Sequence, residues 1–312
     1  MVPLPSLKQL RYLLALSEHL SFTRAAEACF VTQSTLSAGL KELEALLGVR
    51  LVERDRQTVL MTPAGLEAVR RAHSLLAAAQ DLVEVVARTG EAMAALLHLG
   101  VIPTIAPFLL PVALPEIRAQ YPKLRLALRE DLTPNLLSRL ERGELDFALI
   151  ALPYDTGRLL VEPLFDDELW LVAHREDPQL SAREWRMSAT LADRLLLLEE
   201  GHCLRDHVLA ACPHDPGGKR NELVTATSLL TLVQMIESGL GVGLLPAMAV
   251  RGGLVASSAL LAKPLTPTSP TRTVAIVARP SSARNAEFHA LGSLLRALAD
   301  QASRGVRLTA AD

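Results

Sequence analysis

The sequence predicts an α/β protein that begins with a winged helix-turn-helix and a long helix. In the first ninety residues, hydroxyl side chains that can cap helices precede apolar residues spaced three and four apart. From about Leu96 onward, short apolar stretches alternate with helical stretches, which is typical of open α/β sheets. We therefore expect three parts, residues 1–62, 63–92 and 93–312.

Composition narrows the class of protein. A chain of 312 residues, 50% of them hydrophobic, can bury several cores. Its formal charge of −2 supplies no general basic field, so any DNA binding must rest on local geometry. Three cysteines are too few for a disulfide framework and favour reduced thiols in the cytoplasm. The start of the chain lacks the pattern of a signal peptide, and four prolines interrupt the uncharged stretch 92–115, so we expect no membrane span.

Three caps organise the first fifty residues. Ser6 can cap a first helix, and Ser21 can cap a short second helix that runs through Cys29. Thr32 can cap a third helix, which Gly48 is placed to end. This is the helix-turn-helix pattern, and its third helix would lie in the major groove of DNA.

Short polar side chains at the start of the third helix can bond base edges and phosphates. Two short strands, 50–54 and 58–62, surround the polar turn 55–57 and predict a wing whose arginines contact phosphates. For any one of these residues a solvated surface is the alternative, but the combined pattern is more specific than its parts. The candidate DNA-binding residues are Thr32, Gln33, Ser34, Thr35, Ser37, Arg50, Arg54 and Arg56.

A long helix should follow the wing. Thr62 can cap it, and Pro63 suits its first position. Apolar residues at alternating spacings of four and three predict a coiled-coil seam between two copies of the chain, because a palindromic DNA site needs two readers. The alternative is a single amphipathic helix packed on its own domain. The seam residues are Ala68, Ala72, Leu75, Ala79, Leu82 and Val86.

The remaining two thirds read as an α/β module. Predicted strands are residues 96–102, 124–129, 145–151, 169–174, 195–198, 223–225, 241–245 and 273–278, and predicted helices include 134–142, 229–237 and 285–302. A further helix should follow the first strand. Open α/β sheets bind ligands at the carboxyl ends of their strands. The expected ligand loops are therefore Pro103-Thr104, Asp131–Thr133 and Glu200–Cys203.

Cys203 is the candidate reactive group. Gly201 ends the preceding strand and loop, and a helix should begin near His202. The positive helix end, His202 and Arg205 would each favour the thiolate, which is the form that attacks peroxide. Arg205 and Asp206 could hold a departing peroxide oxygen. The alternative is a buried cysteine that packs as a small hydrophobe.

Cys212 lies nine residues after Cys203. In a helix, nine residues advance about 13.5 Å and turn about 900°, which places the two thiols on opposite faces. A disulfide needs Cα atoms about 4.4–6.8 Å apart, so cross-linking would require unwinding. The pair therefore suggests a redox switch with a conformational output, and the alternative is that Cys212 merely packs. Cys29, on the apolar side of the second helix with no adjacent cation, is expected to pack in a core.

The N-terminal motifs resemble those of the LysR-type transcriptional regulators over about sixty residues at diagnostic spacing. The resemblance implies promoter DNA and RNA polymerase as partners. It also implies a regulatory module similar to the two-lobed periplasmic binding proteins, with crossovers between lobes near Val161–Pro163 and Lys263–Thr266. The matching residues are Ser21–Cys29, Thr32–Ser37, Leu43-Glu44, Leu46–Leu51, Glu53-Arg54 and Leu60–Gly65.

The second part of the chain resembles the hydrogen-peroxide sensors of that family. The matching segments are Gly100–Thr104, Leu195–Asp206 together with Cys212, Ala226–Leu229, Gly243–Ala247 and Arg272-Thr273. The resemblance implies that Cys203 attacks peroxide, that Cys212 resolves it, and that a homodimer or homotetramer rearranges its DNA contacts. The implied peroxide pocket comprises Thr104, Thr133, His202, Arg205, Asp206 and Arg272. Segment Pro213–Arg220 departs from the pattern, since it is rich in proline and glycine, so its remodelling should differ.

Two other functions compete. A LysR-type regulator of a small metabolite could bind a carboxylate with Thr104, Thr133 and residues 227–228 between its lobes. A thiol peroxidase would use the same cysteine, but it would have no use for the predicted DNA-binding domain. We therefore do not expect an enzyme. His202, His207 and His214 lack the spacing of metal ligands, and the glycine run 239–243 precedes a strand instead of following one. We therefore expect neither a metal nor a cofactor.

Overall fold

The computed structural model describes residues 3–54, 59–87, 93–177, 185–212, 225–256 and 259–303. The chain divides into two compact units, of which the first comprises residues up to 90 and the second most of the rest. The described residues form one hydrophobic core in the first unit and two in the second. No helix within the described ranges is long and apolar enough to cross a membrane.

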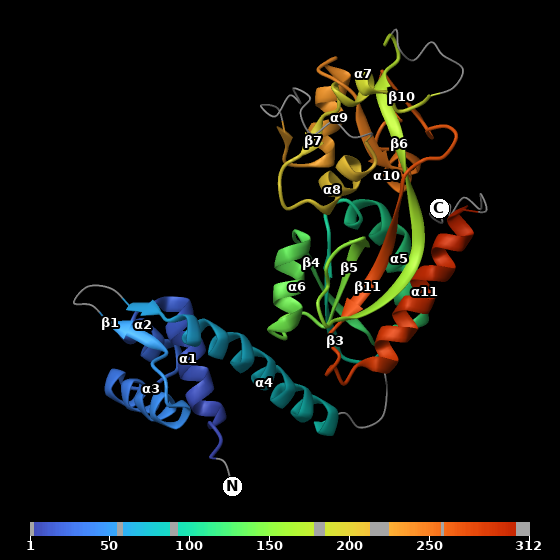
Figure 1. Ribbon diagram of the computed structural model, residues 1–312. Helices are drawn as coiled ribbons and strands as arrows, with labels where there is room; N and C mark the ends of the chain where they lie inside the picture. The colour runs from blue at the N-terminus through green and yellow to red at the C-terminus, as the bar shows by residue number, and fades with distance from the viewer. Residues whose placement is uncertain are drawn as a thin grey trace. The chain divides into compact units, whose positions relative to one another are not determined.

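The first unit is a winged helix-turn-helix followed by a long helix (Figure 1). The predicted caps are confirmed: Ser6, Ser21 and Thr32 each accept a backbone N–H three residues on, and Gly48 ends the third helix at φ 69°. Two antiparallel strands form the wing. The elements are α1 (Leu7–His19), α2 (Phe22–Ala28), α3 (Gln33–Leu47), β1 (Val52–Arg54), β2 (Val59–Met61) and α4 (Pro63–Ala87).

Helix α4 has two different halves. Ala72 is buried in the core of the helix-turn-helix, and Ala68 packs against the same core. Further along, Leu75, Leu82 and Val86 are 52%, 65% and 75% exposed. The first part of the predicted seam therefore packs on its own domain, which was the alternative prediction, and only the second part offers an apolar surface.

The second unit consists of two lobes. In the first lobe, β3 pairs in parallel with β4 and β5, and β11 runs antiparallel to β5. Figure 1 shows β6 as a long strand that runs from this lobe into the other. The first-lobe elements are β3 (Leu96–Val101), α5 (Ala106–Gln120), β4 (Arg125–Glu130), α6 (Thr133–Glu141), β5 (Phe147–Leu152), β6 (Leu160–His174), β11 (Thr271–Ala278) and α11 (Asn285–Ser303).

The second lobe is formed on the far half of β6, which pairs with β9 and β10. A separate parallel pair, β7 and β8, lies beside it. Residues 223 and 224 of the predicted eighth strand, like segment 213–220 and His214, lie outside the described residues. The elements are α7 (Ala189–Ala192), β7 (Leu197–Leu198), α8 (Cys203–Ala210), β8 (Thr225–Ala226), α9 (Leu229–Glu237), β9 (Gly243–Pro246), α10 (Ala247–Arg251) and β10 (Leu260–Lys263).

The first predicted crossover is wrong. Val161–Pro163 lies inside β6 and pairs with β11, and the chain enters the second lobe only at Leu169, where the partner of β6 changes to β9. The second predicted crossover starts at Lys263, which is the last residue of the unpredicted strand β10, and the chain is back at the junction by Thr271. One continuous strand, β6, therefore carries the chain into the second lobe, and residues 264–270, which are not strand, bring it back.

Candidate functional site

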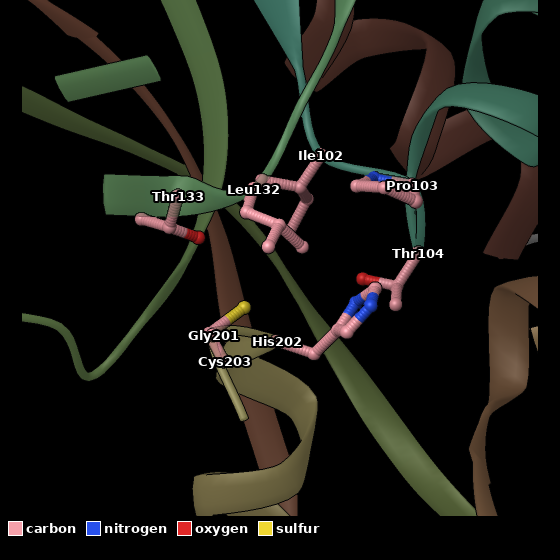
Figure 2. A pocket seen from close by; sticks show the side chains of 8 residues that line it. All are labelled: Ile102, Pro103, Thr104, Leu132, Thr133, Gly201, His202 and Cys203. Atoms are coloured by element: carbon pink, nitrogen blue, oxygen red, sulfur yellow. The ribbon is translucent and has the colours of Figure 1, made fainter. Parts of the chain in front are cut away.

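A narrow pocket of about 160 Å³ lies where three loops of the second unit meet. The loops are those that follow β3, precede α6 and precede α8, as expected from the strand ends. Figure 2 shows the Cys203 sulfur turned into the space beneath Leu132 and Thr133. The pocket is lined by Ile102, Pro103, Thr104, Leu132, Thr133, Gly201, His202 and Cys203.

Local sequence sets the shape of these loops. Asp131 accepts the backbone N–H of Leu132 at 2.9 Å and the side-chain amide of Asn135 at 2.7 Å, which ties this loop to the first turn of α6, where Thr133 is the first residue. Gly201 has φ +94°, a conformation that L side chains rarely adopt, and a Cβ there would come within 3.0 Å of Leu132. Glycine therefore lets the chain turn directly into His202 and Cys203.

Cys203 is the first residue of α8, and its side chain is only 4% exposed. Burial raises the pKa of its thiol above the usual value, while Arg272, the Thr133 hydroxyl and the Ala151 backbone lower it to a smaller extent. The prediction that the surroundings lower this pKa is therefore wrong. The cost of desolvating a thiolate exceeds the stabilisation that the neighbouring groups give, so the resting sulfur is a thiol.

The predicted cations beside the thiol do not act on it. His202 is buried, and burial lowers its pKa against the opposing effects of Glu199 and the Thr227 backbone, so its imidazole is neutral at pH 7. Its ring lies beside Thr104 (Figure 2). Arg205 donates instead to the Leu198 carbonyl at 3.2 Å, and Asp206 is exposed. Neither Arg205 nor Asp206 lines the pocket.

Arg272 supplies the cation from behind the pocket. Its guanidinium is fully buried and donates to the Thr104 hydroxyl at 2.7 Å and to the Thr104 carbonyl at 3.0 Å. It also pairs with Asp167 at 3.0 Å, and Asp167 in turn accepts the backbone N–H of Met248 at 3.0 Å. Because the Thr104 oxygen accepts from Arg272, its own hydrogen is free to donate into the pocket. The sequence did not predict Asp167 as a site residue. It lies opposite Arg272 only because β6 pairs with β11, and this pairing cannot be inferred from a local motif.

Thr133 carries the most informative oxygen of the site. Its hydroxyl is buried and has no hydrogen-bond partner of ordinary geometry among the described residues, although it lies close enough to lower the pKa of Cys203. Leaving a buried hydroxyl unpaired costs about 1–3 kcal/mol. Such a group can bond a small polar molecule held against the sulfur. Ser228, by contrast, caps α9 by accepting the Thr231 N–H at 3.2 Å, so its hydroxyl serves the fold.

Cys203 and Cys212 belong to different cores. Cys203 packs in the first-lobe core, whereas Cys212 is buried in the second-lobe core and its thiol donates to the Val208 carbonyl at 3.3 Å. All three cysteines are free. Cys212 lies two residues beyond the end of α8, so its placement on the opposite face of one helix stays a prediction. Cys29 is half-buried at the end of α2, and burial raises its pKa although Arg11 lies nearby.

The predicted DNA-reading side chains gather at the start of α3. Thr32 caps the helix, and Gln33, Ser34 and Thr35 are exposed in its first turn, while Ser37 is half-buried. Arg50 is exposed before β1, the backbone of Arg54 ends that strand, and Arg56 lies outside the described residues. A second hollow, lined partly by Ser37, Lys41 and Arg50, adjoins this surface; Lys41 was missed because it lies beyond the first turn of α3.

Comparisons with known proteins agree with this architecture. Residues 7–66 match the family described as bacterial regulatory helix-turn-helix protein, lysR family, and residues 90–300 match the LysR substrate binding domain. The HTH-type transcriptional regulator EstR of Acinetobacter baylyi is 46% identical over 95% of this chain and 98% of its own. The DNA-binding transcriptional dual regulator OxyR of Escherichia coli is 38% identical over 95% of this chain and 96% of its own.

Two solved structures are similar over nearly the whole chain. A cysteine-to-aspartate variant of full-length OxyR from Pseudomonas aeruginosa has a TM-score of 0.70 and 38% identity, covering 94% of this chain and 98% of its own. A cysteine-to-serine variant of OxyR from Corynebacterium glutamicum, described as bound to H2O2, has a TM-score of 0.64 and 30% identity, covering 99% of each chain.

Proposed function

Because this chain belongs to the LysR family of bacterial regulatory helix-turn-helix proteins, we propose that it is a DNA-binding transcription regulator that senses hydrogen peroxide through Cys203. The observation that carries the proposal is the pocket, in which a thiol and the unpartnered hydroxyl of Thr133 face one small space. Relatives named hydrogen peroxide-inducible genes activator, 38% identical, support it.

The first step oxidises Cys203. Its thiol loses a proton, and the sulfur attacks one peroxide oxygen as the O–O bond breaks. The products are a sulfenic acid on Cys203 and hydroxide, which takes up the released proton to give water. Thr104 and Thr133 donate hydrogen bonds to the peroxide oxygens, His202 closes the side of the pocket, and Arg272 stabilises the developing anion. A thiolate of high pKa is rare at neutral pH but strongly nucleophilic once formed.

The second step joins Cys203 and Cys212. The Cys212 thiol attacks the sulfenic sulfur, the S–O bond breaks, and water leaves as the disulfide forms. Because the two thiols pack in different cores, this step requires α8 to unwind. The unwinding would remodel the junction of the two lobes and so change the regulatory domain.

The size of the pocket distinguishes peroxide from a larger effector. Pockets that bury metabolites or drug-sized ligands measure about 300–1,000 Å³. The space at Cys203 is a narrow slot with no room for a molecule of that size, which favours a molecule of two heavy atoms over a carboxylic-acid metabolite. A metabolite regulator remains the alternative function, and it would leave Cys203 unmodified by peroxide.

The first unit supplies the output. We propose that the exposed polar residues of α3 and the arginines of the wing contact promoter DNA in the cytoplasm, and that RNA polymerase responds to the bound regulator. The exposed part of the α4 seam, Leu75, Leu82 and Val86, would pair with a second copy of the chain to give a dimer or a pair of dimers.

Brief exposure of the full chain to micromolar hydrogen peroxide tests the proposal. Peptide mass spectrometry with a sulfenic-acid trap should show a Cys203–Cys212 disulfide in the native chain and trapped sulfenic acid at Cys203 in Cys212→Ser. Half-buried Cys29, which packs against the core of the helix-turn-helix, is the internal control and should react more slowly. The proposal fails if Cys29 is oxidised while Cys203 stays intact. Sustained peroxide consumption with a thiol reductant would instead indicate a peroxidase.

A further inference from the structure

Helix α8 is shared between the two lobes. Side chains four residues apart lie on the same face of a helix, so Cys203 and His207 form one face. Cys203 packs in the first-lobe core. The neighbouring face carries Leu204 and Val208, which pack in the second-lobe core together with Cys212, two residues beyond the end of the helix. The helix therefore separates the two thiols and places His207 on the side of Cys203.

His207 ties this face to the first lobe. Its imidazole is buried, and Nε2 lies 3.1 Å from the carbonyl oxygen of Pro153, in the loop that follows β5. A carbonyl can only accept, so Nε2 carries the hydrogen and Nδ1 is the bare acceptor. Tyr154, the next residue of that loop, packs against the same core as Cys203, and burial raises the pKa of its hydroxyl.

The disulfide step cannot leave this bond intact. Joining Cys203 to Cys212 closes a short loop that contains position 207, and Cys203 must turn away from the first lobe to reach its partner. His207, one turn further along the same face, must turn with it, and its bond to Pro153 must break. The hydrogen bond therefore opposes the conformational change that the disulfide needs.

We propose that His207 is a positioning residue that holds α8 against the first lobe and sets how fast oxidised Cys203 reaches Cys212. This inference rests on the proposed function. Nδ1 is buried without a partner among the described residues, so the imidazole makes one hydrogen bond and forgoes another. The hydrogen bond to Pro153 holds the reduced helix in place. The unpaired Nδ1 reduces the net stabilisation that burial of this imidazole gives, so formation of one disulfide can break the bond.

Three variants of the full chain test this role. His207→Leu removes the donor, His207→Gln keeps an N–H that can reach Pro153, and Ala210→Gly weakens the helix at an exposed position without touching that bond. Two rates are measured after peroxide addition: sulfenic-acid trapping at Cys203 in a Cys212→Ser background, and disulfide formation in the chain with both cysteines.

We expect His207→Leu to form the disulfide about three- to tenfold faster, the factor that loss of one buried hydrogen bond gives, with an unchanged rate of trapping at Cys203. His207→Gln should restore the native rate, and Ala210→Gly should accelerate the step less than His207→Leu. The role of His207 is wrong if His207→Leu leaves the rate of disulfide formation unchanged, or if His207→Gln or Ala210→Gly accelerates it equally. The proposed function would survive either result. If no variant forms sulfenic acid at Cys203, the proposed function fails as well.

Discussion

Two threonines of the pocket show how the same residue type can serve the fold or the function. Thr104 has a structural partner, because its hydroxyl oxygen accepts from the buried guanidinium of Arg272. Thr133 is equally buried but has no partner of ordinary geometry among the described residues. The first holds the site together, and the second keeps a hydrogen bond available beside the sulfur. Removing each hydroxyl should therefore have opposite effects on stability.

We predict that Thr133→Val stabilises the protein by about 1 kcal/mol. Valine has nearly the same volume as threonine, so the substitution replaces an unpaired buried hydroxyl with a methyl group and leaves no cavity. The same substitution should slow peroxide oxidation of Cys203 roughly tenfold, since a group that lowers the pKa of the thiol is lost. Thr104→Val is the matched control and should destabilise by about 1–3 kcal/mol, because it leaves a guanidinium N–H unpaired. Urea unfolding and thiol trapping measure both effects; a destabilised Thr133→Val with undiminished reactivity would contradict this assignment.

The sequence predicted which sulfur reacts, but its prediction of the charges that act on that sulfur was wrong. The segment Gly201–Asp206 indicated Cys203 as the reactive cysteine. The adjacent residues His202 and Arg205 were predicted to lower the pKa of its thiol. The fold instead buries the thiol and turns Arg205 toward Leu198. The cation that acts on the sulfur is Arg272, 105 residues from its partner Asp167 in the chain. Burial and strand register decide such effects, and neither is visible in a local motif.

Helix α8 is the element on which the mechanism depends, and its histidines make it sensitive to acid. Burial lowers the pKa of both His202 and His207. Around His207, the Pro153 carbonyl and Asp206 oppose this shift and Arg272 adds to it; around His202, Glu199 and the Thr227 backbone oppose it. Both rings are therefore neutral in the folded chain at pH 7.

The sign of the pH dependence follows. A histidine whose folded-state pKa is depressed contributes stability that is fully present above its unfolded pKa of about 6.5 and is lost as the pH falls toward the folded value. We predict that protection of the α8 amides from hydrogen exchange, corrected for the intrinsic rate, falls over the interval below about pH 6.5. His207→Gln should weaken this fall. Protection independent of pH over that interval would show that neither histidine titrates with the opening of α8.

Elements with strong local signals were predicted well, and those shaped by tertiary context were not. Caps and stops fixed the helices of the first unit, because each depends on side chains a few residues apart. Strand β6 was predicted only over residues 169–174. Its first half contains Glu162, Pro163 and further charged residues, a composition typical of a loop between two strands. That half is held by pairing with β11. Strand β10 was missed for a similar reason, because its pairing with β6 creates it.

In the whole molecule, oxidation of one sulfur is proposed to change how the chain binds promoter DNA. Three features support this: a pocket too small for most metabolites, a helix that packs against the cores of both lobes, and an exposed polar surface on α3 that can contact base edges. A DNA-binding measurement tests the coupling between the regulatory unit and the DNA-binding unit.

The most direct test is a footprint of the full chain on promoter DNA, reduced and after peroxide, for the native protein, Cys203→Ser and Cys212→Ser. We predict that peroxide changes the footprint of the native chain and that both substitutions abolish the change, because the disulfide needs both sulfurs. Loss only in Cys203→Ser would reduce the switch to one thiol. A peroxide-dependent change that survives in Cys203→Ser would contradict the central claim.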